Sequence, residues 1–260
     1  MRHPAGSHGS RGVARSAPFL LLSIRGEDEA ADDEYDAVMR FGGLHSTGLH
    51  RIRLTHESLE PIDLSDWSGI IIGGGPYNVS DVAESKSATQ QRVESELFAL
   101  LGRIVDQDYP FLGCCYGVGT LGTIIGADID RTYPEPVGGM EITITSAGRE
   151  DPLFAELPDT FDAYGGHKEA AATLPADAVC LATSPQCPVQ AFRVGENVYA
   201  TQFHPELDLA GIDTRVDAYK NHGYFAPESA EELKREARQW NVQHPHTILR
   251  RFVERYSKPA

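Results

Sequence analysis

The chain has 260 residues, 41% of them hydrophobic, and a formal net charge of -15 at pH 7. This length and apolar content can supply a full core for one large domain or for a domain with an extension. The negative charge repels phosphate groups, so we expect neither nucleic acid nor a membrane surface as a partner. The four cysteines include no CxxC pair, which predicts neither a zinc site nor a disulfide framework and favours a cytoplasmic location.

The composition divides the chain into a leader, a main domain and an extension. Residues 1–17 are basic, rich in Gly and Ser and without an apolar central segment, which predicts a disordered leader and not a signal peptide. Residues 18–207 are expected to form the main domain, and residues 208–260 a helical extension packed on it. No later stretch is apolar for long enough to span a bilayer.

The first half of the chain alternates between predicted strands and helices. Continuous apolar runs predict buried strands, and apolar residues at helical spacing predict two long helices, the second with an Asp81/Glu84 capping box near its start. The strands are expected at residues 19–24, 49–54, 69–72 and 110–112, and the helices within residues 27–42 and 81–109. This order predicts an open, mostly parallel twisted sheet with helices on both faces, in which chemistry gathers at the C-terminal ends of the strands.

The pattern changes after Asp128. Alternating and short apolar segments predict a small antiparallel portion, and the end of the chain is expected to be mainly helical. The strands are expected at residues 137–146, 178–182, 189–194 and 198–203, and the better-marked helices at residues 229–240 and 247–256.

The segment PFLGCCYGVGTL, residues 110–121, predicts a strand, a sharp turn and a helix, with a thiol at the turn. Cys115 stands between Gly113 and Gly117, as a nucleophile on a strained turn requires. At a helix N-terminus, unpaired N–H groups and the helix dipole favour the reactive thiolate. The alternative interpretation is that Cys115 is a small buried hydrophobe beside Cys114.

A cysteine nucleophile also needs a base and a group that orients the base. The segment QFHPE supplies both in His204 and Glu206, which project to the same face if the segment is extended. An oxyanion needs two backbone N–H donors. Tyr116 and a glycine of the loop 73–75, at the end of a predicted strand, are the candidates.

Three motifs, IIGGGP, PFLGCCYG and QFHPE, occur in this order and together resemble the class I (triad) glutamine amidotransferases. The resemblance is strongest to small stand-alone proteins related to the glutaminase domain of GMP synthetase, and it covers roughly residues 18–207 as the catalytic domain. It implies the flavodoxin-like fold of that family and a glutaminase in which Cys115 forms a γ-glutamyl thioester, His204 gives a proton to ammonia and Glu206 orients His204. Gly75 and Tyr116 match the oxyanion positions, with Gly74 as the other candidate.

Two places in the sequence concern the substrate. The family pattern CxGxQ has a glutamine four residues after the nucleophile that helps to seat the substrate, but this chain has Gly119 there. The segment YGGHKEA aligns with a family segment that lines the pocket, so Gly166 and His167 are candidate substrate contacts. The alternative for His167 is a solvent-facing polar residue. We expect no metal and no cofactor.

Three functions are compatible with these residues. The first is hydrolysis of L-glutamine with delivery of ammonia to a separate synthetase, because the chain offers no room for an ATP-binding acceptor domain and has no GxxxxGK[ST] motif. The second is a stand-alone hydrolase of γ-glutamyl amides or peptides, with Gly119 widening the pocket. The third is a non-catalytic redox or ligand-binding module built on Cys114 and Cys115. The combination of Cys115, His204 and Glu206 favours an enzyme.

Overall fold

The structure is a computed structural model that describes residues 17–221, 223 and 225–258 of the chain. The leader expected over residues 1–17 lies outside these described residues, except for Ala17. Among the described residues, no helix combines the length and the apolar character that a membrane crossing requires.

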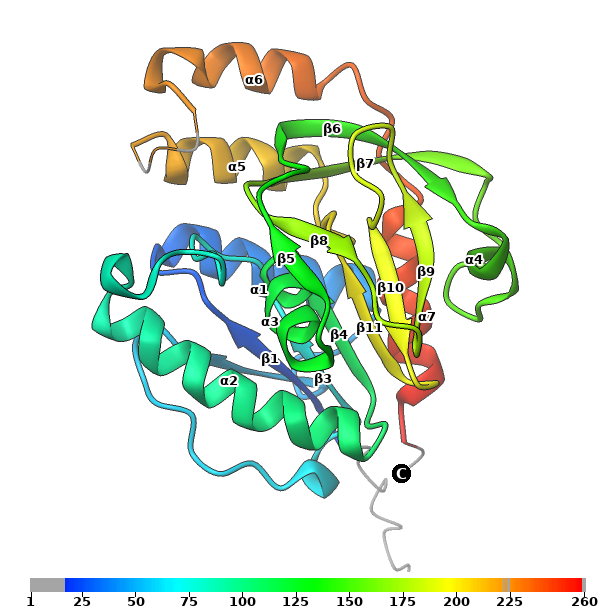
Figure 1. Cartoon of the computed structure of the whole chain (residues 1–260). Helices are drawn as coiled ribbons and strands as arrows, with labels where there is room; N and C mark the ends of the chain where they lie inside the picture. The colour runs from blue at the N-terminus through cyan, green and yellow to red at the C-terminus, as the bar shows by residue number, and fades with distance from the viewer. Residues whose placement is uncertain (1–16, 222, 224, 259–260) are drawn as a thin grey trace, which may run out of the picture.

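One nine-stranded sheet forms the centre of the molecule, in the order β2-β1-β3-β4-β11-β10-β9-β6-β7 (Figure 1). Its first five strands are parallel to one another, which fits the apolar sequences of the inner strands because strands buried on both faces need no polar side, whereas the edge strand β2 combines apolar and polar residues. These strands are β1 (Phe19–Ser23), β2 (Leu49–Arg53), β3 (Gly69–Ile72), β4 (Phe111–Cys114) and β11 (Val198–Thr201).

The other four strands extend the sheet with antiparallel pairings. They are β10 (Ala191–Val194), β9 (Ala178–Thr183), β6 (Glu135–Ile144) and β7 (Thr160–His167). A separate two-stranded sheet pairs β5 (Asp128–Asp130) with β8 (Ala170–Thr173). The predicted antiparallel portion is therefore present, and it includes β5, β7 and β8, which the sequence pattern did not indicate.

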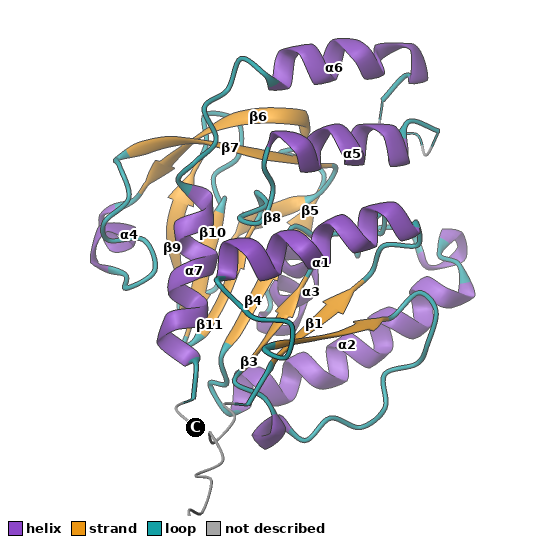
Figure 2. Cartoon of the chain, turned by 180° about the vertical axis from the view of Figure 1, so that it is seen from behind, coloured by secondary structure: helices purple, strands orange, loops and turns teal. Residues whose placement is uncertain are grey.

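Helices cover both faces of the parallel part of the sheet (Figures 1 and 2). Leu21 of β1 packs in one core cluster with residues of α1 (Asp28–Gly42) and α7 (Pro245–Tyr256). Its neighbours Leu20 and Leu22 face the opposite side, where they pack with α2 (Ala88–Asp106) and α3 (Tyr116–Ile125). The predicted open α/β fold is thus confirmed.

Two further helices, α5 (Leu209–Tyr219) and α6 (Ala230–Ala237), lie one above the other beyond the ends of the parallel strands (Figure 1). Their apolar side chains form a third cluster with Tyr164 of β7 and Leu207. The residues after Leu207 are therefore mainly helical, whereas the division of the chain at residue 207 stays a prediction. The remaining short elements are α4 (Ser146–Glu150) and the 3-10 turns η1 (Leu64–Asp66), η2 (Ala83–Ser85) and η3 (Pro227–Ser229).

The predicted capping box at Asp81 and Glu84 is wrong. Helix α2 begins at Ala88, and its N-cap is Ser87, whose hydroxyl accepts a hydrogen bond from the Gln90 N–H. Asp81 instead accepts a bond from the Gln90 side chain and belongs to the loop before the helix. Serine at the N-cap is as favourable as aspartate, so the local sequence offered two starting points.

Candidate active site

Cys115 lies at the turn between β4 and α3, as the sequence predicts. Its backbone has φ +53° and ψ -89°, a conformation that costs a non-glycine residue energy and is maintained only by the surrounding structure. The Cys115 N–H donates to the carbonyl of Thr201 on the neighbouring strand, at 2.7 Å. A Cβ on Gly113 would come within 2.8 Å of the Gly117 Cα, so the turn needs glycine at that position. This geometry holds the thiol beyond the C-terminal end of a central strand.

The expectation of a stabilised Cys115 thiolate is contradicted. Removal of the thiol from water raises its pKa to about 11, and Glu169 and Glu206 act in the same direction, whereas Arg25 opposes them. The Cys115 side chain keeps some exposed surface because it borders two cavities. The resting group is therefore a neutral thiol, and it requires a base when it attacks.

His204 and Glu206 form a buried pair. His204 Nδ1 donates to Glu206 Oε1 at 2.8 Å, which leaves Nε2 as the nitrogen that can accept a proton. Burial lowers the pKa of His204 below its ordinary value, although Glu206 opposes this effect. Burial raises the pKa of Glu206, but His204, Arg215 and Arg25 outweigh it and hold that pKa well below its ordinary value. Glu206 is hence a carboxylate, and His204 is available as a neutral base.

The local backbone around this pair differs from the extended segment that we expected. Strand β11 ends at Thr201, and the residues from His204 onward form a turn in which the Leu207 N–H donates to the His204 carbonyl at 3.2 Å. The His204 N–H donates to the Tyr164 carbonyl at 3.0 Å. The turn, and not strand alternation, brings the imidazole and the carboxylate together.

Two buried arginines that sequence reasoning missed hold the carboxylates of this region. Arg25 Nε donates to Glu34 at 2.8 Å, and Arg215 Nη2 donates to Glu206 at 3.0 Å. Arg25 lies two residues after the C-terminal end of β1, where functional residues of such sheets are expected. This position could have indicated Arg25 as a site residue. Arg215 lies on α5, within the segment expected to be helical, but nothing in the local sequence indicated that its side chain reaches the site.

The glycine loop 73–75, after β3, contacts the His204 imidazole and borders the cavities beside Cys115. A Cβ on Gly74 would overlap the His204 imidazole, so Gly74 lets the ring lie against the loop. Gly75 lines both cavities beside Cys115, whereas Gly74 lines neither. Tyr116 is the first residue of α3, so its N–H has no acceptor within the helix. Gly75 is consequently better placed than Gly74 to share an oxyanion with Tyr116.

The strand β7 brings Gly166 and His167 to the same region. Cys115 Sγ lies 4.0 Å from the Gly166 carbonyl oxygen. The His167 imidazole is buried, and its Nε2 lies 2.8 Å from Glu135 while its Nδ1 lies 2.9 Å from the Glu169 carbonyl. His167 is therefore not a solvent-facing residue. His167 also borders the second cavity.

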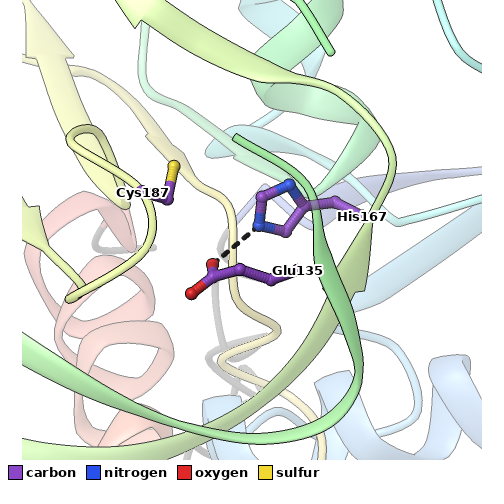
Figure 3. A group of neighbouring side chains, drawn as sticks. All are labelled: Glu135, His167 and Cys187. Carbon is purple, nitrogen blue, oxygen red and sulfur yellow. Dashed lines mark hydrogen bonds and ion pairs between the residues drawn. The ribbon is translucent and has the colours of Figure 1, made fainter. Parts of the chain in front are cut away.

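Glu135, His167 and Cys187 are a group that could hold a metal ion, since one ligand atom of each lies within 4.8 Å of the others (Figure 3). Glu135 also accepts hydrogen bonds from Ser184 and Gln190, and these bonds with that from His167 lower its pKa although burial raises it. The Glu169 carbonyl and the Glu135 carboxylate are both acceptors, so each ring nitrogen of His167 faces an oxygen within hydrogen-bond distance. His167 is therefore part of a buried hydrogen-bonded cluster with Glu135.

Glu169 stands beside Gly119, a contact that nothing in the sequence indicated. Both Glu169 carboxylate oxygens accept backbone hydrogen bonds, from Val79 at 2.9 Å and Ser80 at 2.8 Å. A Cβ on Gly119 would come within 2.5 Å of Glu169 Oε1. The space expected to widen the pocket is therefore partly filled by this carboxylate, whose pKa is raised chiefly by burial.

The fold is an open α/β sheet, and its candidate reactive side chains lie beyond the C-terminal ends of β3, β4 and β11. This position of the site is typical of proteins of the open α/β class. The model of the glutamine amidotransferase class-I family matches residues 37–216. The chain belongs to this family, and the membership predicted from the three motifs is confirmed.

Relatives and solved structures agree with this assignment. The chain is similar to a subunit of the glutamine-hydrolysing GMP synthase of Methanobrevibacter smithii, with 30% identity over 151 residues, 58% of this chain and 70% of that one. It is 30% identical to the glutamine-hydrolysing GMP synthase of Listeria welshimeri over 160 residues, which are 61% of this chain but only 27% of that relative. A glutamine amidotransferase from Thermotoga maritima has a TM-score of 0.73 at 22% identity and is similar in fold over 92% of this chain and 98% of its own.

Proposed function

We propose that this chain hydrolyses the side-chain amide of L-glutamine through a thioester on Cys115, giving glutamate and ammonia. The observation that carries the proposal is that Cys115 and His204 line the same cavity, with Glu206 bonded to the far nitrogen of His204. The family also supports an amidohydrolase. The combination of thiol, base and orienting carboxylate argues against a non-catalytic module.

In this mechanism the Cys115 sulfur attacks the amide carbon while the thiol proton passes to His204 Nε2. The N–H groups of Tyr116 and Gly75 stabilise the oxyanion, and one such donor contributes on the order of 3 kcal/mol. His204 then gives its proton to the departing nitrogen, and the C–N bond breaks. Water, deprotonated by His204, hydrolyses the thioester. Glu206 fixes the tautomer of His204 and stabilises its charged form throughout.

We propose that the segment 165–169 forms the wall of the substrate pocket. Gly166 presents its backbone to the thiol, and His167 contributes through its backbone and ring edge, because Glu135 and the Glu169 carbonyl occupy its nitrogens. The polar second cavity, bordered by Asn78 and Glu169, suits the amino-acid end of a glutamyl group.

We further propose that the ammonia is used by a separate synthetase, as the relatives that are named subunits of GMP synthase suggest. A stand-alone hydrolase of γ-glutamyl amides or peptides is the second candidate, because this chain has Gly119 where the family pattern has a glutamine. The four free thiols are consistent with a reducing compartment such as the cytoplasm.

Release of ammonia and glutamate from L-glutamine by the purified protein tests the proposal. Cys115→Ala should abolish release while the protein remains folded. Cys114→Ser is the matched control, because Cys114, the last residue of β4, is buried in a core cluster and should be dispensable for turnover. Release that persists in Cys115→Ala would refute the mechanism.

A further inference from the structure

Helix α5 contributes two polar side chains, one turn apart, to the buried charges of the candidate active site. Arg215 Nη2 donates to Glu206 Oε1 at 3.0 Å, and the Tyr219 hydroxyl accepts a hydrogen bond from Arg25 at 3.2 Å. Residues four apart on a helix lie on the same face, so both contacts come from one side of α5, which lies beyond the ends of the parallel strands (Figure 1). The helical segment after Leu207 therefore reaches the site through Arg215.

A single carboxylate oxygen links the base to this helix. Glu206 Oε1 accepts from His204 Nδ1 at 2.8 Å and from Arg215 Nη2 at 3.0 Å. Glu206 Oε2 is buried and has no hydrogen-bond partner in the part of the chain that the structure describes. Arg215 therefore holds the same oxygen that orients the imidazole, and a shift of its guanidinium would move that oxygen.

Four buried charges lie together here and balance one another. Arg25 bonds to Glu34 at 2.8 Å, and Arg215 bonds to Glu206 at 3.0 Å and lies 3.9 Å from Glu34. The two cations and two anions sum to zero when His204 is neutral. A proton on His204 would add a third cation, whose Nδ1 lies 3.2 Å from Arg215 Nη1, and such repulsion is strong where water is excluded. Arg215 thus acts with burial to lower the pKa of His204.

Further ionisable groups face this cluster, and they add little charge to it. The Cys114 and Cys115 thiols and His246 of α7 are neutral, because burial raises the pKa of each thiol and lowers the pKa of the imidazole. Asp208, the N-cap of α5, is paired with an exposed arginine of α1 at 2.7 Å. Asp33 of α1 is partly exposed, so water screens its charge, and burial raises its pKa. The charge balance at His204 therefore depends chiefly on the two pairs of arginine and glutamate.

We propose that Arg215 is a positioning residue of the Cys115 reaction: it fixes Glu206 Oε1 against His204 and supplies the positive charge that balances Glu206. This inference rests on the proposed function and adds to it a residue of α5 that acts through Glu206 and His204. An arginine with a structural role alone would attach α5 to the rest of the protein and leave the protonation of His204 unchanged.

The test measures ammonia release from L-glutamine between pH 5 and pH 9 by the full chain and by Arg215→Met, Arg215→Gln and Arg215→Lys. Without the charge at residue 215, His204 is protonated at higher pH, so the acidic limb of kcat/KM should move up by about one pH unit in the Met and Gln variants. Their kcat at the optimum should fall about tenfold or more, with a smaller change in KM, because Glu206 no longer holds His204 in place. Arg215→Lys keeps the charge and should restore the limb and most of kcat.

Arg238→Met is the matched control. Arg238, at the end of α6, bonds to Asp213 of α5 at 2.6 Å, so this change removes a cation and an ion pair of the same helix without touching Glu206. The acidic limb and kcat should stay as in the wild type. Arg215→Gln keeps a hydrogen-bond donor for Glu206 and provides the uncharged variant if circular dichroism shows that Arg215→Met does not fold.

The outcomes separate the inference from the proposed function. Cys115-dependent turnover of glutamine with the acidic limb at the same pH in the wild type and in the uncharged variants would overturn the inference alone. A limb that moves as far in Arg215→Lys or in Arg238→Met as in the uncharged variants would also overturn it. If Cys115-dependent release of ammonia is absent from the wild type, both the inference and the proposed function fail.

Discussion

The Glu169 carboxylate stands against the face of α3 that carries Gly119, so close that a Cβ on Gly119 would come within 2.5 Å of Glu169 Oε1. Two backbone N–H groups hold that carboxylate, so it cannot move away without losing hydrogen bonds. The absence of a side chain at residue 119 and the presence of an acid at residue 169 are therefore two parts of one packing arrangement.

Gly119→Ala should consequently destabilise the protein by about 1–3 kcal/mol, the usual range for an added methyl group in a packed site. In a Glu169→Ala background the same change should cost less, because the obstructing oxygen is gone. Unfolding midpoints in urea for the two single variants and the double variant give the coupling free energy. Additive effects would show that the two positions do not interact.

The raised pKa of Cys115 predicts how its reactivity depends on pH. A thiol whose pKa is about 11 should be alkylated by iodoacetamide at a rate that continues to rise from pH 7 to beyond pH 9. Peptide mass spectrometry after brief treatment distinguishes Cys115 from the other thiols. A rate that is already constant between pH 6 and pH 8 would instead indicate a preformed thiolate and imidazolium pair, in which the two groups titrate together.

The protonation of His204 should determine how kcat/KM depends on pH on the acidic side. His204 must be neutral to accept the thiol proton, and its pKa is lowered below 6.5 mainly by burial. Activity should therefore fall only below pH 6.5 on the acidic side. Measurement of kcat/KM for the best substrate between pH 5 and pH 9 checks this expectation, and half-maximal activity above pH 7 on the acidic side would contradict it.

Glu206→Gln should destabilise the protein by at most about 3–5 kcal/mol, because it removes the nearer carboxylate partner of the buried Arg215 and leaves only Glu34, at 3.9 Å. The folded-state pKa of Glu206 lies below the unfolded value, so its stabilisation is present above pH 4.5 and is lost as the pH falls below it. The difference in unfolding free energy between wild type and variant should therefore shrink from pH 6 to pH 3. A constant difference would show that the Glu206 charge contributes no stability.

The buried contact of Glu135 with His167, at 2.8 Å, should also support the pocket wall. Glu135→Gln should weaken this buried pair and raise KM more than it lowers kcat, because the pair holds the segment that carries Gly166. Glu141→Gln, an exposed change on the same strand, is the matched control and should alter neither constant.

Zn²⁺ should leave the unfolding temperature of the wild type unchanged. A rise that Glu135→Gln or Cys187→Ala abolishes would instead indicate a metal site.

The parallel half of the fold could be predicted because its signal is local. Residues 19–24 and 69–72 are continuously apolar or nearly so, and such runs bounded by glycine or polar residues are typical of strands buried on both faces. Strand β7 could not be predicted in this way, because Gly165 and Gly166 interrupt it and its pairing with β6 is a long-range property. Helix α5 lies within the segment expected to be helical, but its bounds were not predicted because its apolar residues are interrupted by Asp213, Arg215 and Asp217.

The residues of the candidate site also divide into those that the local sequence indicates and those that it does not. Cys115, His204 and Glu206 could be selected from the sequence because each stands in a short motif with a chemical reason for its residue types. Arg215 and Glu169 could not, because their importance comes from contacts that the local sequence does not reveal. The pKa of the Cys115 thiol depends on burial by the whole site. The helix N-terminus alone predicted a lowered pKa, whereas burial raises it.

The most direct test of the central claim is to trap the thioester. The protein is mixed with its best γ-glutamyl substrate, quenched in acid within one turnover, digested and examined by mass spectrometry. The account predicts a γ-glutamyl group on the peptide that contains Cys115, retained in Cys114→Ser and lost in Cys115→Ala. Turnover by Cys115→Ala, or an adduct on Cys114 with Cys115 unmodified, would contradict it.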